Sequence, residues 1–413
     1  MSKDIAKYKQ TEVGEIPVAW VIKKIVQCAE ILDNHRKPLN QAERMLMKGN
    51  IPYYGANGIV DFINEYLLDE DLILIAEDGG YFDEYQTRPI AYKIKGKSWV
   101  NNHAHILRVK SELVQDFVFY SLEHKNILPW LNGGTRAKLN KGELEKITIA
   151  VPSFSEQKQI AKILNIWDNG INKTKEIIAE LKQRKKGLAQ EILLGKIRFS
   201  ETQNSPLVKN KGYVIPKDWK VAPISKLVKQ VKKSVIPEPD TLYSQIGIRS
   251  HAKGIFYKEA VTGLSLGNKS VFEIEPDCFI VNIVFAWEHA IAKTTINEAG
   301  MIASHRFPMY KPLENELDLN YLLHFFKSKK GKELLGIASP GGAGRNKTLG
   351  QSEFLKLQIP VPTLTEQNKI AEFLDKIDAE IIVHHQKLAH LQNQKKGLMQ
   401  QLLTGKTRVK LND

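Results

Sequence analysis

The sequence predicts an α+β fold in which two globular domains are separated by two long antiparallel coiled-coil helices, with a pseudo-twofold internal repeat. Three observations lead to this prediction. Residues 151–199 recur as residues 361–409 with 20 identities in 49 aligned positions, and both copies carry a heptad pattern. The segment before each copy mixes β-branched runs with glycine and asparagine turns. We therefore expect a globular domain at 1–150, a helix segment at 151–199, a linker and second globular domain at 200–360, and a second helix segment at 361–413.

The two globular segments begin and end alike. Ile16-Pro17-Val18-Ala19-Trp20 recurs as Ile215-Pro216-Lys217-Asp218-Trp219, and helical stretches at 116–128 and 319–335 come before the two copies of the repeat. Apolar runs such as 279–285 predict buried strands between these marks.

Each copy of the repeat has helix start and stop signals. The segments 152–156 and 362–366 have a Pro-Ser/Thr-x-x-Glu pattern, which predicts capping boxes in which the carboxylate reaches back to the cap residue. Gly195 and Gly405 are placed as left-handed C-terminal caps. Between start and stop lie about 39 residues, or roughly 58 Å of helix.

Apolar residues recur in both copies at alternating steps of four and three, which predicts a coiled-coil seam. In the first copy the seam residues are Ile160, Leu164, Trp167, Ile171, Thr174, Ile178, Leu181, Lys185, Leu188 and Ile192. In the second they are Ile370, Leu374, Ile377, Ile381, His384, Leu388, Leu391, Lys395, Leu398 and Leu402. We interpret His384 as a polar seam residue that sets register, with a titrating switch as the alternative.

The two helices are expected to pair antiparallel, because this places the preceding globular domains at opposite ends and relates the halves as in an isologous dimer. Ile163, Ile177, Phe373 and Ile382 lie off the seam and suggest that helices of partner subunits dock there.

Composition favours a polyanionic partner. The net charge is +14 and the pI about 9.4, although Lys and Arg only balance Asp and Glu, 20 against 20, in residues 1–150. No apolar run is long enough for a membrane span and the start lacks a signal-peptide pattern, so we expect a cytoplasmic protein with no membrane association. Cys28 and Cys278 show no metal-ligand spacing, and we expect two small buried side chains in preference to a disulfide.

No chemistry-bearing motif is found. The sequence has no GxxxxGK[ST] phosphate loop, no [DN]PP[YFW] methyltransferase motif, no GxGxxG and no PD…(D/E)xK nuclease pattern. This predicts a protein that is not an enzyme and holds no cofactor. His103 and His105 are poor candidates for a metal site, because no third ligand follows at a usual spacing.

Polar clusters and two glycine-rich loops supply candidate DNA contacts. The loops 132–140 and 340–349 lie before the two helices at the same offset, and glycine lets backbone approach phosphate while Arg, Asn and Lys reach phosphates or base edges. The alternatives are tight structural turns and ordinary solvated loop polarity. The candidate residues are Asn101, Asn102, His103, His105, Arg136, Lys138, Arg249, Ser250, His251, Lys253, His305, Arg306, Arg345, Asn346 and Lys347.

The chain resembles the specificity subunits of type I restriction-modification systems over essentially its whole length. The resemblance rests on two variable blocks that are each followed by a Pro-x-x-x-Glu-Gln helix ending in Lys-Lys-Gly-Leu and Gly-Lys. Segments 248–251, 285–288, 304–308 and 341–347 of the second block also resemble target-recognition domains of that family, and segment 53–58 of the first does so more loosely.

The resemblance implies a non-catalytic subunit whose two target-recognition domains bind the halves of a split, asymmetric double-stranded DNA site. The two helices would be the conserved spacers on which two methylation subunits, carrying S-adenosylmethionine, dock to modify an adenine in each half-site. Restriction subunits using ATP and Mg would join this core.

Two other functions stay open at the level of sequence. One is the recognition subunit of a two-chain restriction-modification enzyme outside type I, and the other is a free-standing DNA-binding protein that dimerises through the coiled coil.

Overall fold

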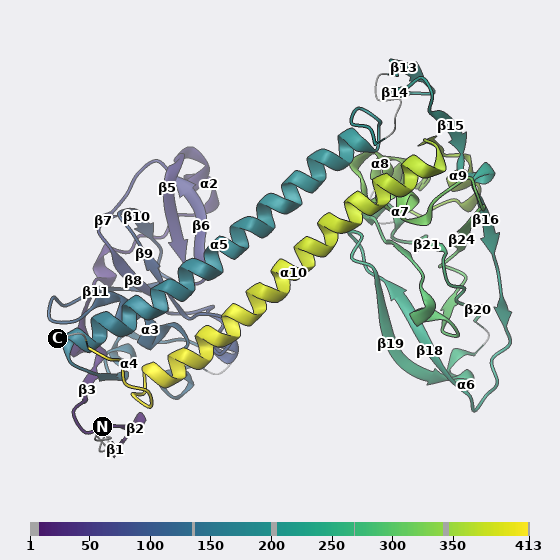
Figure 1. Cartoon of the computed structure of the whole chain (residues 1–413). Coiled ribbons are helices and arrows are strands. Elements are labelled where there is room, and N and C mark those ends of the chain that lie inside the picture. The colour runs from purple at the N-terminus through teal and green to yellow at the C-terminus, as the bar shows by residue number, and fades with distance from the viewer. Residues whose placement is uncertain (1–7, 134–136, 200–204, 268, 342–346, 412–413) are drawn as a thin grey trace. The chain divides into compact units, whose positions relative to one another are not determined.

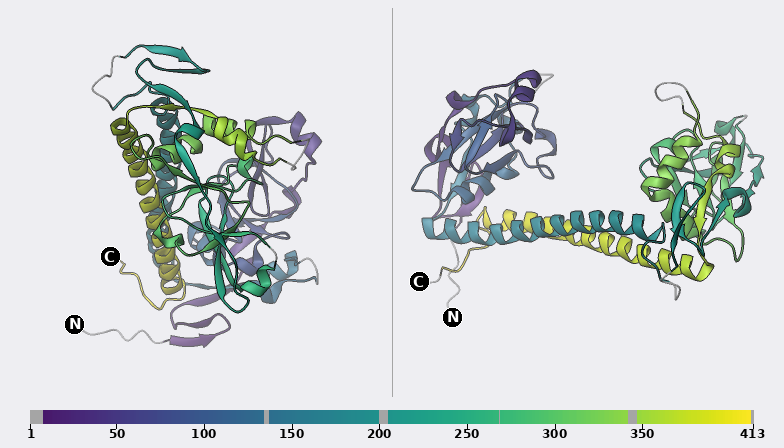
Figure 2. Two further views of the ribbon diagram at one scale, coloured as in Figure 1. Left: turned by 90° about the vertical axis from the view of Figure 1, so that its right-hand side faces the viewer. Right: turned by 90° about the horizontal axis from the view of Figure 1, so that it is seen from above.

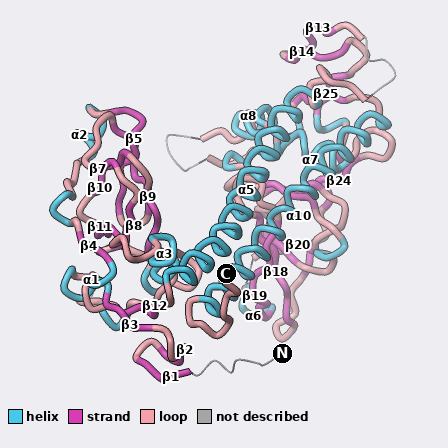
Figure 3. Tube along the Cα trace, turned by 60° about the vertical axis from the view of Figure 1, so that its left-hand side comes forward, coloured by secondary structure: helices cyan, strands magenta, loops and turns pink. Residues whose placement is uncertain are grey.

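The computed structural model describes residues 8–133, 137–199, 205–267, 269–341 and 347–411 (Figure 1). Tertiary contacts divide the chain into two compact units, Met1–Lys175 with Gln386–Asp413, and Glu176–His385. Each unit contains one globular domain together with part of both long helices. Both domains combine sheets with short helices, which confirms the predicted α+β class (Figure 3).

The first unit is built from two four-stranded sheets, in the orders β6-β5-β10-β7 and β4-β11-β8-β9, with two further strand pairs, β1-β2 and β3-β12. Its strands are β1 (Tyr8–Thr11), β2 (Gly14–Pro17), β3 (Val21–Lys24), β4 (Ala29–Ile31), β5 (Lys48–Gly55), β6 (Gly58–Ile63), β7 (Leu68–Asp69), β8 (Leu72–Ala76), β9 (Ala91–Ile94), β10 (Lys97–Val100), β11 (Ala104–Val109) and β12 (Thr148–Val151). Its short helices are α1 (Ile25–Cys28), α2 (Gln41–Leu46), α3 (Gln115–Glu123) and α4 (Lys141–Leu144). All five residues of β8 are buried, so this strand forms the centre of the core.

The second unit repeats this plan with a five-stranded sheet, β17-β20-β23-β18-β19, and a four-stranded sheet, β16-β24-β21-β22, beside the pairs β13-β14 and β15-β25. Its strands are β13 (Leu207–Asn210), β14 (Tyr213–Pro216), β15 (Lys220–Pro223), β16 (Val228–Val231), β17 (Ser234–Val235), β18 (Leu242–Ile248), β19 (Ile255–Thr262), β20 (Val271–Glu273), β21 (Phe279–Val281), β22 (Ile291–Lys293), β23 (Ile302–Ser304), β24 (Met309–Pro312) and β25 (Gln358–Val361). Its short helices are α6 (Gly263–Leu266), α7 (Leu319–Lys327), α8 (Lys329–Ile337) and α9 (Gln351–Lys356).

The short helices differ from the prediction in detail. The stretch 116–128 is helical only to Glu123, and the stretch 319–335 is two helices, not one. The break falls at Ser328, whose hydroxyl accepts a hydrogen bond from the Gly331 N–H at 3.1 Å and so caps the second helix.

The two repeat copies form helices α5 (Phe154–Ile192) and α10 (Leu364–Leu402), which run side by side within each unit (Figures 1 and 2). Their predicted stops are confirmed, since Gly195 and Gly405 have φ values of 68° and 71°. Every predicted seam residue is buried or half-buried, which confirms the coiled-coil seam.

The ion pairs between the helical segments show antiparallel packing inside each unit. In the first unit Lys395 binds Asp168 at 2.7 Å, close to the end of α10 and the start of α5. In the second unit Lys185 binds Asp378. A second pair in each unit, Glu156 with Arg408 and Arg198 with Glu366, shows that within each unit the partner's number falls as the residue number rises, as predicted.

Each unit closes one end of its helix pair with the same three side chains, which we call the helix clasp. In the first unit the Glu156 carboxylate accepts from Trp20 Nε1 at 3.2 Å and from Arg408 Nε at 2.6 Å. In the second, Glu366 accepts from Trp219 Nε1 at 3.1 Å and from Arg198 Nε at 2.6 Å. The tryptophan of the Ile-Pro-x-x-Trp repeat is therefore the residue that the globular domain contributes to the clasp.

The predicted capping boxes are wrong in one respect, the partners of the two glutamate side chains. Ser153 and Thr363 accept from the N–H groups of Glu156 and Glu366 at 3.4 Å, as expected of N-caps. The carboxylates, however, bind the indole and guanidinium groups instead of reaching back to the cap residues. A buried carboxylate is stabilised more by a charged fork and an indole N–H than by one backbone amide, which accounts for the difference.

The glutamine that follows each clasp glutamate ties the long helix to a short one. Gln157 Oε1 accepts from the N–H of Val114, the N-cap of α3, at 2.9 Å. Gln367 Oε1 accepts from the N–H of Asp318, the N-cap of α7, at 2.9 Å. The Glu-Gln pair thus fixes the domain on the helices through two independent contacts.

Other predictions have mixed outcomes. Cys28 and Cys278 are buried free thiols, as predicted. Of the off-seam residues, Ile163 and Phe373 pack against their own domain cores, whereas Ile177 and Ile382 are exposed. In the part of the chain that the structure describes, no helix combines the length and apolar character that a membrane span requires.

Candidate nucleic-acid interface

In the second unit, one loop brings together three polar segments that are far apart in the sequence. This loop, residues 282–288, follows β21 and contains a one-turn 3-10 helix, Ala286–Glu288. The Ile283 N–H donates to the Arg306 carbonyl at 3.0 Å, and the Ile283 carbonyl accepts from the Leu349 N–H at 2.8 Å. The loop therefore holds the segments around Arg306 and Leu349 next to each other.

The third segment, 249–253, is the turn between β18 and β19. The Glu288 carboxylate accepts from Ser250 Oγ at 2.9 Å, and the Glu288 carbonyl accepts from the His251 N–H at 2.8 Å. His251 has a positive φ of 61°, a conformation that costs a non-glycine residue about 1 kcal/mol or more and is held here by these bonds. Arg249 and Lys253 are exposed at the two ends of the turn.

The gathered segments present cations and aromatic groups together. His305 and Arg306 are exposed after β23, and the Lys347 ammonium lies 5.9 Å from the centre of the Trp287 ring. Phe285 is exposed in the same loop. Exposed Arg and Lys side chains beside aromatic faces suit phosphate neutralisation and base contacts. Arg345 and Asn346 lie outside the described residues.

In the first unit, Asn101, Asn102 and His103 line a cavity of about 500 Å³ with the turn between β5 and β6. Asn101 is buried, and its side-chain carbonyl accepts from the His103 N–H at 2.8 Å. His103 Nδ1 lies 2.6 Å from Asp78 Oδ1. Asn57, on the turn, donates to the Gly79 carbonyl at 2.9 Å. Amide groups on several sides give this cavity the donors and acceptors that base edges require.

His105 and Lys138 belong to an ion-pair network behind this cavity. His105 is 1% exposed, and its ring nitrogens lie 2.6 Å from an Asp33 carboxylate oxygen and 2.7 Å from the Leu139 carbonyl. This buried placement gives His105 a structural role in place of the predicted DNA contact. Lys138 binds Glu77 at 2.9 Å and remains half exposed. Arg136 lies outside the described residues.

The carboxylates of this network resemble a metal-ligand set, since Asp33, Glu77 and His105 lie within 4.8 Å of one another. Arg36, however, binds both carboxylates, and Lys138 binds Glu77 as well. Burial would raise the pKa of Asp33, but the hydrogen bond from His105 and the neighbouring charges hold the pKa below its usual value. Arg36 and Lys138 already neutralise the two carboxylates, so the arrangement does not suit a metal ion.

Sequence reasoning missed the residues that organise both surfaces. Glu288 and Ile283 hold the three segments of the second unit together, and Asn57 and Asp78 complete the cavity of the first. The Gly-Ala-Asn-Gly turn at 55–58 was a signal for Asn57, whereas nothing in the sequence pairs Glu288 with a turn 38 residues earlier.

Comparison with known proteins identifies related chains. The model of the type I restriction modification DNA specificity domain matches twice, at residues 17–183 and 216–393. A candidate type I restriction enzyme specificity subunit of Haemophilus influenzae is 29% identical, covering 87% of this chain and 88% of the relative. The type I restriction enzyme MjaVIII specificity subunit of Methanocaldococcus jannaschii is 26% identical, covering 98% of this chain and 96% of the relative.

Solved structures share the fold. The S subunit of a type I restriction-modification system from M. genitalium aligns with a TM-score of 0.57 at 12% identity, covering 93% of this chain and 96% of that one. A structure describing complex assembly and conformational transition of a type I R-M system aligns with a TM-score of 0.51 at 11% identity, covering 95% and 99%.

Proposed function

The chain belongs to the type I restriction modification DNA specificity family, and from that membership we propose that its two domains bind the two halves of an asymmetric DNA site. It is the specificity subunit of a type I restriction-modification system, which recognises DNA and is not itself the catalyst. The proposal concerns how this chain divides the recognition between its domains.

The observation that carries the proposal is the gathering of three segments in the second domain. Arg249, Lys253, Arg306 and Lys347 come from separate parts of the sequence, and the loop 282–288 brings their segments to one place. Positive charge gathered on this surface favours a phosphate backbone, and the neighbouring Trp287 and Phe285 offer apolar contact to bases.

The first domain uses a different surface chemistry. Its charge is balanced overall, and its cavity is lined by Asn57, Asn101, Asn102 and His103 in place of a row of cations. Asparagine side chains recognise adenine through paired hydrogen bonds to N6 and N7. We therefore assign the first domain a larger share of base contacts relative to phosphate contacts than the second.

Partner subunits supply the chemistry in this proposal. Two methylation subunits carrying S-adenosylmethionine would dock on the helices and modify an adenine in each half-site, and restriction subunits using ATP and Mg would add cleavage. Exposed apolar side chains on the helices support such docking: Ile166 is 62% exposed, Ile382 56% and Val383 60%. Exposed isoleucine and valine side chains on a helix are typical of an interface core.

The decisive experiment exchanges residues 220–360 for the corresponding block of a relative and sequences the methylome of cells that also express the neighbouring methyltransferase. One half of the methylated site should change completely while the other stays the same. A change in both halves would contradict independent recognition by the two domains.

A second measurement tests the division of labour. The purified chain with S-adenosylmethionine should transfer no methyl group to plasmid DNA and should cut none, whereas addition of the methylation subunits should restore transfer. Methylation by the isolated chain would contradict the non-catalytic role. A stable homodimer that binds DNA specifically without these subunits would favour the free-standing DNA-binding protein instead.

A further inference from the structure

The junction between the long helices and the short helix is built from equivalent positions in the two units but differs in charge at one of them. Val114 and Asp318 are both N-caps, and each donates its N–H to the equivalent glutamine of its repeat copy. The residues that follow them in the two short helices therefore correspond. Tyr120 in α3 then corresponds to His324 in α7, and Glu123 corresponds to Lys327. On the long helices, Lys395 corresponds to Lys185 through the repeat.

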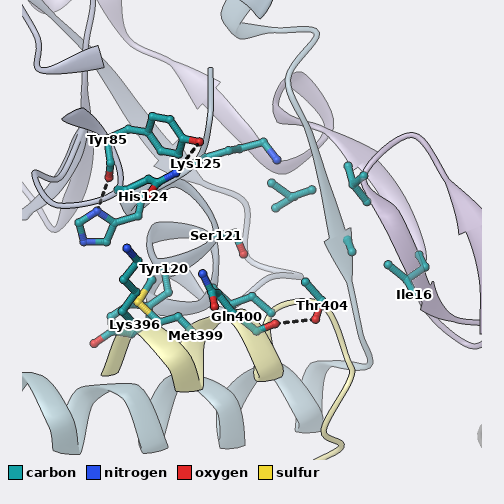
Figure 4. A pocket seen from close by; sticks show the side chains of 15 residues that line it. Ile16, Tyr85, Tyr120, Ser121, His124, Lys125, Lys396, Met399, Gln400 and Thr404 are labelled. Carbon is teal, nitrogen blue, oxygen red and sulfur yellow. Dashed lines mark hydrogen bonds between the residues drawn. The ribbon is translucent and has the colours of Figure 1, made fainter. Parts of the chain in front are cut away.

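In the first unit this junction is a closed, neutralised network. The Lys395 ammonium binds Glu123 at 2.9 Å and Asp168 at 2.7 Å, and its side chain is only 8% exposed. Tyr120 donates to Asp168 at 2.6 Å. The pocket beside it, about 340 Å³, is lined by two lysines, Lys125 and Lys396 (Figure 4). Each charge of the network therefore has a partner of opposite sign.

In the second unit the same junction opens into a cavity of about 470 Å³ with a strongly positive lining. Six lysines line it: Lys182, Lys185 and Lys186 from α5, Lys327 from α7, and Lys329 and Lys332 from α8. None of the described residues that line the cavity is acidic. The nearby carboxylates are already bound, Asp378 by Lys185 and Asp375 by His324 at 2.8 Å.

Two further features add to the positive potential. Ser328, the N-cap of the nine-residue helix α8, lines the cavity, so the partial positive charge of that helix terminus adds to the lysines. Lys327 takes the place of Glu123. Burial lowers the pKa of Lys327, the charge of Asp378 raises it, and the like charge of Lys185 lowers it. Lysines gathered in this way repel one another, and a bound anion reduces that repulsion.

We propose that this lysine cavity of the second unit binds phosphate groups, and that in the assembled system these are phosphates of the DNA backbone. The proposal rests on the proposed DNA-binding function and extends it to a surface that none of the predicted contact residues occupies. A metal ion does not fit, because six lysines and none of the acidic residues that could ligate it line the cavity among the described residues. Lysine ammonium groups are strong phosphate partners and carry no base specificity, so this site contributes affinity without selecting sequence.

The test measures binding of the full-length chain to a duplex containing its site and to a random duplex, over a range of salt concentrations. The variants are Lys182→Gln/Lys186→Gln, Lys329→Gln/Lys332→Gln and Lys327→Glu, the last of which reproduces the charge of the first unit. Exposed side chains are changed in both double variants, so folding should be preserved. The matched control is Lys226→Gln/Lys229→Gln, which removes the same charge from exposed positions of the same domain outside the cavity.

We expect each cavity variant to weaken binding to both duplexes by about tenfold and to reduce the salt slope by one to two units, with a smaller change in the control. A parallel calorimetric titration with tripolyphosphate distinguishes the source of phosphate. Binding of tripolyphosphate that the cavity variants abolish, with DNA affinity unchanged, would identify a free polyphosphate as the occupant of the same site.

Cavity variants that match the wild type in both assays, or a control that loses as much affinity as they do, would overturn the proposal. The outcome is separable from the proposed function. A wild-type chain that does not prefer its own duplex contradicts specific recognition whatever the variants do, whereas specific binding with unaffected variants contradicts only the lysine cavity.

Discussion

The two units keep the same clasp and differ at the junction next to it. In both, a tryptophan and an arginine hold one glutamate where the domain meets the helices. At the junction both units keep an equivalent ion pair, Lys395 with Asp168 and Lys185 with Asp378, but the first unit adds Glu123 where the second has Lys327. A repeated scaffold can thus keep the contacts that hold a domain in place while neighbouring positions change charge.

The charges at the two junctions have different consequences: those of the first unit stabilise its fold, and those of the second favour an anionic ligand. A network in which every charge has a partner stabilises the first unit and offers little to a ligand. A cavity with six lysines does not stabilise the second unit, because like charges repel, and it is useful only when an anion is present. Equivalent substitutions in the two units should therefore have unequal effects.

The largest effect is expected at the clasp, and it should be larger in the second unit. Glu366→Gln removes the charge that faces Arg198, whose side chain is only 4% exposed, and should lower the free energy of unfolding by about 3 to 5 kcal/mol, as for other broken buried pairs. Glu156→Gln should cost less, because Arg408 is 39% exposed and can be hydrated. Denaturant-dependent hydrogen exchange of the backbone amides in the strand pair β15 and β25 and in the strand pair β3 and β12 measures the free energy of unfolding of each unit separately. Equal losses would contradict the role given to arginine burial.

The second effect concerns the junction lysines. Lys395→Met leaves Glu123 and Asp168 without their ammonium partner and should destabilise the first unit by about 2 to 3 kcal/mol, somewhat below a fully buried pair because both carboxylates keep some solvent contact. Lys185→Met in the second unit removes a repulsion with Lys327 along with one pair to Asp378, so its cost should stay within about 0.5 kcal/mol. The same hydrogen-exchange measurement applies. A large loss for Lys185→Met would mean that the second junction is also structural.

A third effect concerns binding alone. Arg306→Ala and Lys347→Ala should leave folding unchanged and weaken binding through the second domain. If these side chains contact phosphate, the loss is similar for all sequences and the salt slope falls by about one unit for each contact. If they contact a base, selectivity relaxes at one position by roughly 1 to 3 kcal/mol. Unchanged affinity and selectivity in both variants would assign the gathered segments a structural role.

The sequence predicted the periodic features of the molecule and missed the long-range ones. The coiled-coil seam and the helix stops at Gly195 and Gly405 followed from residue spacing, because a helix fixes which positions share a face. The antiparallel pairing followed from the order of the elements, since a globular domain precedes each helix. The clasp was not predicted, since Trp20 and Glu156 are 136 residues apart and a glutamate at that position also fits a capping box.

The candidate site was predicted only in part for the same reason. Arg249, Arg306 and Lys347 were chosen one by one as cations in polar loops, which is a local property. Their common location depends on hydrogen bonds to Ile283 and Glu288, which no spacing rule connects to them. His105 was chosen by the same local reasoning, but a partner 72 residues away, Asp33, binds it in the interior.

The smallest expected effect concerns an additional ion pair of the arginine in the second clasp. In the second unit Arg198 also binds Asp218 at 2.8 Å, whereas the first unit has Ala19 at the corresponding position. The hydrogen bond from Arg198 is the first cause that lowers the pKa of Asp218, so the pair stabilises the folded state above the ordinary carboxyl pKa and this contribution is lost as the pH falls below it. Because Asp218 is 37% exposed and screened by water, Asp218→Ala should cost only about 0.5 kcal/mol at neutral pH, and the difference from wild type should narrow as the pH falls below the ordinary carboxyl pKa. Measuring unfolding of the second unit at pH 7 and near pH 3 checks both points. A loss of several kcal/mol would show that Asp218 is required to hold Arg198 against Glu366, and the two clasps would then not be equivalent.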